Sequence, residues 1–230
     1  MTSTANSRDW RTYHNRNPRH QRIVELWVRD LIAYFRGQSW LNSDCAVLDF
    51  GCGYFDAGLA LADRVGRIDG IDIEANALEV SRLRTSHLPA TNLFASNDEL
   101  PLGTYDLIFA NSVFQYLQSD EAITSTLMMF RTLLKPGGRG EVLLVDLIPQ
   151  SYSSVRDASR SMWVAARHGV LGAMVRYLWK AAFRKHGLAL HRIDADRMAE
   201  LADAAGFDCT KLPVNLTPSR QRYSCLLKLR

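Results

Sequence analysis

The chain has 230 residues, which suits one α/β domain with a sizeable core and perhaps a small insertion. Hydrophobic residues make up 47% and charged residues 23%, a composition that excludes a low-complexity or largely disordered protein. The net charge of +4 is unevenly distributed, because residues 41–150 carry −8 whereas residues 151–192 carry +7. The basic segment leaves nucleic acid or another anionic partner open.

The sequence contains no segment typical of secretion or of a membrane span. Residues 1–22 are polar and rich in arginine, without the apolar core of a secretory signal. No run of about 18 apolar residues occurs. The four cysteines lack the C-x-x-C spacing of metal sites, so we expect reduced thiols in a cytoplasmic protein. They are Cys45, Cys52, Cys209 and Cys225.

An amphipathic helix is predicted near the N-terminus. Pro18 suits the first turn of a helix, and apolar residues recur with helical spacing from Arg19 to Phe35. We expect residues 1–40 to form a helical cover for the domain that follows.

The stretch Val47–Gly53 predicts the main ligand site. Its apolar residues indicate a buried parallel strand, its two glycines a tight turn, and the pattern after them a helix packed on the sheet. Ligands of open α/β sheets bind beyond the carboxyl ends of the strands. A dinucleotide-binding turn needs a third glycine where Asp56 stands, and Asp49 disfavours a phosphate at this turn. The turn therefore favours a cationic or ammonium-bearing ligand.

A second strand, Arg67–Ile73, brings another acid to the same edge of the sheet. Asp72 follows the glycine turn by about 20 residues, where a Rossmann-like fold places the carboxylate that binds two ribose hydroxyls. The neighbouring Glu74 could instead belong to the start of the next helix, predicted over Ala75–Arg84.

Further strands and helices alternate after this point. The segment Tyr105–Leu117 predicts a buried strand followed by polar residues that either enter the ligand site or face water. Ser119 is expected to cap the helix that ends at Leu134. The other strands are predicted over Asn92–Ala95, Glu141–Leu147, Phe207–Val214 and Arg222–Leu229, with a last helix over His191–Ala205.

The predicted fold class is α/β. We expect a Rossmann-like seven-stranded sheet with helices on both faces and a helical insertion over residues 151–192, before the last helix. The last two strands, joined by Asn215–Ser219, are expected to form an antiparallel hairpin.

The order of these motifs resembles that of the class I S-adenosylmethionine-dependent methyltransferases. The acid and glycines of Asp49–Gly53 resemble motif I of that family, and Gly70–Ile73 resembles motif II. Phe55 stands where the family often has a third glycine. Leu133–Gly138 is similar to its helix-to-strand joint. The resemblance implies S-adenosyl-L-methionine as the cofactor and one methyltransferase domain over residues 1–230.

The resemblance also implies which residues contact that cofactor. Asp72 would bind the ribose, and Ile73 would lie against the adenine. Ser96 stands where the family has an adenine-binding aspartate, and Asn97 or Asp98 could substitute for it. The expected set is Asp49, Gly51, Cys52, Gly53, Asp72, Ile73, Ser96, Asn97, Asp98, Asn111, Ser112, Gln115 and, for the cofactor's carboxylate, Arg22 or Arg19.

No catalytic base is singled out by the sequence. Methyl transfer from a sulfonium depends mainly on positioning and on exclusion of water, and a base is needed only for a protonated acceptor. The candidates are Tyr116, His14, His168, His186 and His191.

The expected acceptor is a small molecule such as a metabolite, a sugar or a lipid precursor. Asn111–Phe114 lacks the two prolines of amino-directed DNA methyltransferases, which disfavours nucleic acid. An RNA methyltransferase and a catalytically degenerate cofactor-binding partner protein are the alternatives. Residues 151–192 are interpreted as a lid over the acceptor, with an anionic membrane or nucleic-acid surface and a solvated helical face as rivals.

Overall fold

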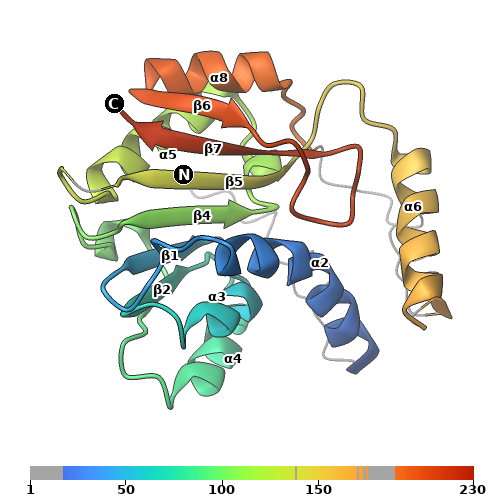
Figure 1. The fold of residues 1–230 in the computed structure, drawn as a ribbon, viewed down its shortest axis with the longest axis horizontal. Coiled ribbons are helices and arrows are strands. Elements are labelled where there is room, and N and C mark those ends of the chain that lie inside the picture. Colours follow the sequence, from blue (N-terminus) through green and yellow to red (C-terminus); the bar gives the residue numbers. More distant parts are fainter. Residues whose placement is uncertain (1–17, 138, 170, 173–174, 176–189) are drawn as a thin grey trace.

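Seven strands among the described residues form one sheet at the centre of the molecule (Figure 1). The computed structural model describes residues 18–137, 139–169, 171, 172, 175 and 190–230. The sheet order is β3-β2-β1-β4-β5-β7-β6, with β7 antiparallel to both of its neighbours and the other pairs parallel. The strands are β1 (Ala46–Phe50), β2 (Arg67–Ile71), β3 (Leu93–Phe94), β4 (Leu107–Asn111), β5 (Glu141–Leu147), β6 (Phe207–Lys211) and β7 (Tyr223–Leu229).

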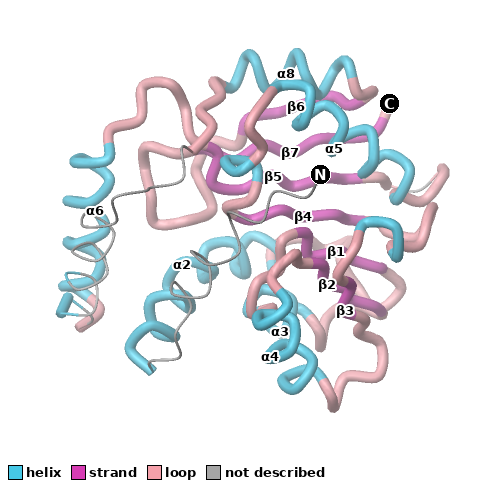
Figure 2. The backbone as a smooth tube through the Cα atoms, turned by 180° about the vertical axis from the view of Figure 1, so that it is seen from behind, coloured by secondary structure: helices cyan, strands magenta, loops and turns pink. Residues whose placement is uncertain are grey.

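Helices cover both faces of this sheet (Figure 2), as the sequence predicts. Six α-helices and two short 3-10 helices are described. They are α2 (Pro18–Arg36), α3 (Asp56–Leu61), α4 (Ala75–Thr85), η1 (Asn97–Glu99), η2 (Phe114–Tyr116), α5 (Asp120–Leu133), α6 (Ser154–Arg167) and α8 (Ala195–Ala204).

Alternate residues of the central strands belong to two separate cores. In β4, Ile108 and Ala110 pack with α5 and α8, whereas Leu107 and Phe109 pack with α2 and α3. This alternation follows from the two-residue repeat of a strand, and it explains why a sheet covered on both faces has continuous apolar strands. Burial on both faces fixes the register that brings the strand ends together.

Several predicted boundaries of helices and strands are wrong. The last helix begins at Ala195 rather than at His191, because the His191 N–H donates to the Gln115 carbonyl (2.8 Å) and the Ile193 N–H to Ile148 (2.8 Å). Strand β6 ends at Lys211, shortly before Pro213, which has no N–H to donate. Strand β2 ends at Ile71 rather than at Ile73, and the short strand β3 contains only Leu93 and Phe94.

The carboxyl ends of β4 and β5 point toward the side of the molecule where α6 lies (Figure 1). Helix α6 stands apart from the helices that cover the sheet, and it falls in the segment for which the sequence predicts a helical insertion. No helix among the described residues is long and apolar enough to cross a membrane.

Candidate functional site at the carboxyl edge of the sheet

The turn after β1 has the backbone that its glycines predict. Gly51 and Gly53 have positive φ angles of 73° and 51°, a region that only glycine adopts at little cost. The N–H groups of Gly51 and Cys52 donate to the Ile71 carbonyl at 2.8 and 2.9 Å, which ties the turn to β2. A side chain at Gly51 would strike Val113, whereas a Cβ at Gly53 would meet nothing within 4 Å. Gly53 therefore faces open space in which a ligand can approach the backbone.

Phe55 keeps the same turn without the third glycine of the resembled motif. Its φ of 62° is left-handed, and its buried ring lies in the space beside Gly58 and Gly70, where a Cβ on either glycine would overlap the ring. Arg84 of α4 holds the next residue through an ion pair with Asp56 (2.7 Å). The turn is thus an intact, braced structure, which argues against a degenerate site.

Asp72 lies beside the turn, as predicted. Its carboxylate accepts hydrogen bonds from the N–H of Gly53 (2.7 Å) and from the N–H of Glu74 (2.9 Å), one on each oxygen. A carboxylate oxygen has two lone pairs, so each oxygen can accept another donor such as a ribose hydroxyl. The adjacent Ile73 is 91% exposed, which leaves an apolar side chain free to lie against a planar ring.

Asp49 is a buried acid at the carboxyl end of β1. Only 3% of the residue is exposed, and burial together with the nearby charge of Asp72 raises its pKa well above the ordinary value of 3.8. A cationic group in the site would favour the ionised carboxylate again. Burial also raises the pKa of the Cys52 thiol, so this side chain stays protonated in the wall of the site.

The carboxyl end of β4, the strand next to β1, contributes further polar atoms to the site. The side-chain oxygen of Asn111 is buried and has no hydrogen-bond partner among the described residues. Ser112, with a positive φ of 60°, donates its hydroxyl to Asp146 (2.8 Å), and Gln115 accepts from Arg222 (3.2 Å). The unpaired oxygen of Asn111 is an acceptor available to an ammonium group of a ligand.

The predicted adenine contacts are less well defined by the structure. The hydroxyl of Ser96 accepts from the Asp98 N–H (3.3 Å) and caps η1, and the side chains of Asn97 and Asp98 are exposed. Ser96 therefore has a structural role here, and its contact with adenine stays a prediction.

The candidate bases receive little support. Burial raises the pKa of Tyr116, although Gln115 and Arg222 act in the opposite direction, so its phenol stays protonated at neutral pH and can donate rather than accept a proton. His168 is exposed at the end of α6, and the ring of His191 lies 3.6 Å from Asp120. His14, His186 and the side chain of Arg22 lie outside the described residues.

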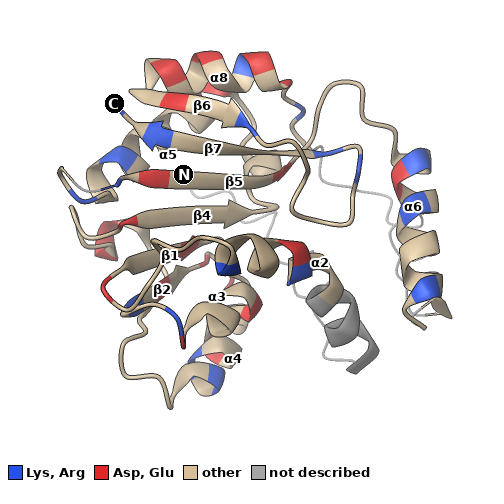
Figure 3. Ribbon diagram, viewed as in Figure 1, with Lys and Arg blue, Asp and Glu red and all other residues tan. Residues whose placement is uncertain are grey.

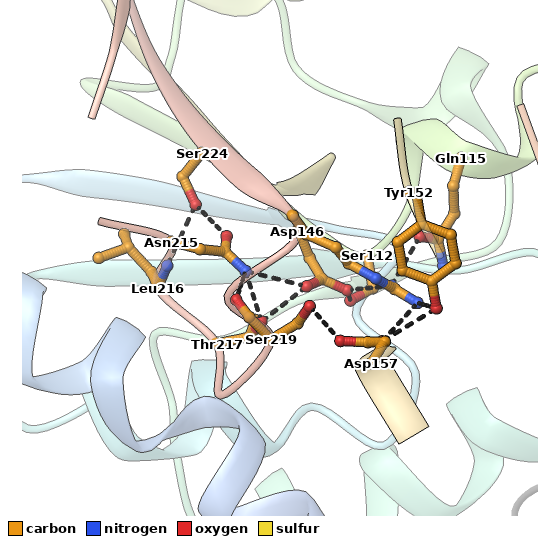
Figure 4. Close-up of polar contacts among 11 residues, drawn as sticks. Ser112, Gln115, Asp146, Tyr152, Asp157, Asn215, Leu216, Thr217, Ser219 and Ser224 are labelled. Atoms are coloured by element: carbon orange, nitrogen blue, oxygen red, sulfur yellow. Dashed lines mark hydrogen bonds and ion pairs between the residues drawn. The ribbon is translucent and has the colours of Figure 1, made fainter. Parts of the chain in front are cut away.

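Sequence reasoning misses a set of polar residues next to Ser112 and Gln115. Asp146 is a buried acid near the carboxyl end of β5, the same relative position that Asp49 occupies in β1, and this pattern could have revealed it. Arg222 forms an ion pair with it, and five further residues gather around it (Figure 4): Tyr152, Asp157, Asn215, Thr217 and Ser219. Among the described residues, no group of three or more His, Cys, Asp or Glu side chains is suited to hold a metal.

Comparisons with known proteins agree with this geometry. A family model described as "Methyltransferase domain" matches residues 48–139, which include the glycine turn, Asp72 and the end of β4. The matched stretch is a class I S-adenosylmethionine-dependent methyltransferase domain. S-adenosylmethionine is accordingly its cofactor.

The names of two similar proteins give different methyl acceptors, a ribosomal protein and trans-aconitate. It is 37% identical over 97 residues to "Ribosomal protein L11 methyltransferase" of Ralstonia pickettii, covering 40% of this chain and 29% of that protein. It is 32% identical over 169 residues to "Trans-aconitate 2-methyltransferase" of Rhizobium etli, covering 70% of this chain and 55% of that protein. The chain thus spans only part of these curated relatives.

A solved structure extends the similarity of fold to nearly the whole chain. Magnesium protoporphyrin IX methyltransferase from Synechocystis PCC 6803, with bound SAH, superposes with a TM-score of 0.60 at 18% identity. The match covers 98% of this methyltransferase and 94% of that chain. At this identity the comparison supports the fold alone.

The residues present at the carboxyl edge fit the cofactor of this family. Gly53 offers open space, Asp72 has spare acceptor sites for the ribose, and Ile73 offers an apolar surface for adenine. Asp49 and the orphaned oxygen of Asn111 suit a cation. We propose these five residues as the cofactor contacts.

The raised pKa of Asp49 predicts a pH dependence in both binding and stability. As pH rises above 3.8, the cofactor-free folded protein must ionise a buried acid, so its stability falls until the raised pKa has been passed. Affinity for S-adenosylmethionine should rise over the same range, because the cation favours the ionised form. Asp49→Asn should flatten both curves and weaken binding at neutral pH by about tenfold.

Thermal unfolding and titration calorimetry between pH 4 and pH 8 would measure both effects. Wild-type and Asp49→Asn protein with parallel curves would show that Asp49 neither titrates in this range nor meets the cofactor.

Proposed function

We propose that this chain transfers the methyl group of S-adenosylmethionine to a small-molecule acceptor, such as a metabolite, a sugar or a lipid precursor. The observation that carries methyl transfer is the glycine turn itself, with Gly53 open to a ligand and bonded to the Asp72 carboxylate (2.7 Å). The bound cofactor would supply an activated methyl group, so the chain must chiefly orient it and exclude water.

The distribution of charge supports a small acceptor over a polyanion. Residues 41–150, which include the glycine turn, Asp72 and the end of β4, carry a net charge of −8. A net negative charge of this size repels the phosphates of nucleic acid. The match to the trans-aconitate enzyme, over 169 residues, is also longer than the 97-residue match to the ribosomal-protein enzyme.

One observation favours an anionic surface as a second partner. Helix α6 carries Arg156, Arg160 and Arg167 (Figure 3), while its acid Asp157 is buried. Trp163 is 51% exposed, with the guanidinium groups of Arg160 and Arg167 at 4.7 and 5.6 Å from its ring. Basic helices with exposed aromatic residues bind anionic membranes or RNA, and binding of that kind weakens steeply with salt.

Labelled methyl transfer separates these possibilities. The protein is incubated with S-adenosylmethionine labelled in its methyl group and with a cell extract divided into small-molecule, RNA and protein fractions. We expect label in the small-molecule fraction only. Label confined to RNA or to protein would replace the proposed acceptor class, and no label in any fraction would contradict methyl transfer.

Two controls sharpen this experiment. A Gly53→Val variant should fold and yet give no incorporation, which ties the label to this site. Binding to anionic vesicles and to RNA at low and moderate salt, for the wild type and a variant with Arg156, Arg160 and Arg167 changed to glutamine, tests the α6 surface separately.

A further inference from the structure

A buried polar network joins β5 to the start of α6 across the carboxyl edge of the sheet (Figure 4). Its centre is Asp146, which has a left-handed φ of 72° next to an irregularity in the pairing of β5 with β7. A non-glycine residue keeps such a backbone only when its surroundings hold it there. The left-handed backbone of Asp146 therefore indicates that the contacts of its side chain hold it in this conformation.

Every acceptor position of the Asp146 carboxylate is occupied. One oxygen accepts from Thr217 (2.6 Å) and Asn215 (3.2 Å), and the other from Ser112 (2.8 Å) and Arg222 (2.5 Å). A carboxylate offers about four lone-pair sites, so Asp146 has none left for a substrate. Asp146 therefore has a structural role, in which it positions the four residues that donate to it.

Arg222 connects this carboxylate to a second one on α6. Its guanidinium reaches the Asp146 carboxylate, the Gln115 side chain (3.2 Å), the Tyr152 hydroxyl (3.4 Å) and the Asp157 carboxylate (3.7 Å). Burial alone would lower the pKa of Arg222, but Asp146, Tyr152 and Asp157 raise it, so the group stays charged. One largely buried cation thus contacts carboxylates from two different elements.

The hydrogen bonds and ion pairs between α6 and other described elements are concentrated at its first turn, although Ser161, Val164 and Ala165 further along the helix are buried as well. Asp157 accepts from Ser219 (2.5 Å) and Tyr152 (2.9 Å) in addition to its ion pair with Arg222. Ser153, which precedes the helix, exchanges two hydrogen bonds with the side chain of Gln221. Among the described residues, no hydrogen bond or ion pair that joins the rest of α6 to another element is found.

We infer that Asp157, Arg222 and Asp146 are positioning residues, which fix the start of α6 against the ends of β4 and β5 so that the helix lies on the acceptor side of the site. This inference rests on the proposed function for its catalytic meaning. It goes beyond the proposed function because the same network also bonds Ser112, through Asp146, and Gln115, through Arg222. Both residues follow β4, next to the proposed cofactor site. One cluster therefore sets the position of α6 relative to the cofactor residues.

Asp157→Asn is the most informative variant. It removes the outer carboxylate and leaves the inner pair of Asp146 and Arg222 with balanced charges, so the fold should persist. Arg222→Met would instead leave two buried carboxylates without a cation and could unfold the protein. Ser219→Ala is a milder variant, because it removes only the hydrogen bond from the Ser219 hydroxyl to the Asp157 carboxylate.

Asp120→Asn is a matched control. Asp120 is also an acid in the first turn of a helix, paired with an arginine (Arg197, 2.8 Å), but it lies on α5. Both variants remove one negative charge from the first turn of a helix, although the side chain of Asp120 is more exposed than that of Asp157 (33% against 12%), and only one of them touches α6.

The test combines hydrogen exchange with activity. In Asp157→Asn we expect the amides of α6 to exchange at least about tenfold faster, with strand amides unchanged. Affinity for S-adenosylhomocysteine should stay within about twofold of wild type, while labelled methyl transfer falls at least about tenfold. Ser219→Ala should show the same pattern more weakly, and Asp120→Asn should show neither change.

Two results would overturn the inference: wild-type exchange of α6 in folded Asp157→Asn, or undiminished methyl transfer despite faster exchange. If the wild type methylates no fraction of the extract, the proposed function fails on its own. The exchange data would then still decide whether the network anchors α6.

Discussion

Asp72→Ala is expected to weaken binding of S-adenosylmethionine by at least about tenfold. The variant removes the acceptor proposed for the ribose hydroxyls, and hydrogen bonds to a charged acceptor contribute roughly 1.5–3 kcal/mol each. It also releases the N–H groups of Gly53 (2.7 Å) and Glu74 (2.9 Å), so the turn loses its support. Titration calorimetry on folded protein measures the change. Asp72→Asn should give a smaller loss, because the amide keeps one acceptor oxygen.

Asp106→Ala is the control for this experiment. The Asp106 carboxylate also accepts a hydrogen bond from a backbone N–H, that of Ala46 (2.8 Å), and forms an ion pair with Lys135 (2.6 Å). Unlike Asp72, Asp106 lies at the amino ends of the strands. We expect lower stability and unchanged cofactor affinity. Unchanged affinity in folded Asp72→Ala would remove Asp72 from the cofactor site.

Gly53→Val is expected to abolish cofactor binding, with a loss of at least about 100-fold. A Cβ at Gly53 meets no protein atom within 4 Å, so the new side chain occupies the open space through which the ligand would approach. The positive φ of 51° adds strain of order 1–3 kcal/mol for a β-branched residue. Gly51→Val should also abolish binding, but it clashes with Val113 and so should lower stability more.

Gly137→Val controls for the strain. Gly137 has a similar φ of 68° and equally open surroundings, but it precedes β5 at the opposite end of the sheet. Calorimetry and thermal unfolding should show similar destabilisation in Gly137→Val and Gly53→Val, with binding lost only in the latter. If folded Gly53→Val binds normally, the cofactor does not lie on this turn.

The cofactor half of the fold could be predicted because its signals are local. Asp49, Gly51 and Gly53 are consecutive parts of one strand and turn, and Asp72 follows at a distance set by one helix and one strand. Apolar strands that alternate with helices along the chain then predicted the parallel sheet. The αL conformation of Phe55 was not predictable, since it depends on a space that only the folded Gly58 and Gly70 create.

The network around Asp146 could not be assembled from the sequence, because its partners are far apart in the chain. Asp146 meets Thr217 and Arg222 across separations of 71 and 76 residues, and Ser219 meets Asp157 across 62. Antiparallel pairing of β7 with β5 brings these residues together. From the sequence alone, only the place of Asp146 near the end of a predicted strand could be recognised. Polar residues of a loop otherwise suggest contact with water, whereas Thr217 and Ser219 are buried.

Hydrogen exchange with and without saturating S-adenosylhomocysteine tests most directly where this methyltransferase binds its cofactor. The ligand should slow exchange in residues 51–56, 72–74 and 111–116, the three segments that meet at the carboxyl edge. Amides of β6 and of the amino ends of the strands should not change. Protection confined to other segments, or none at saturation, would contradict the assignment of the site.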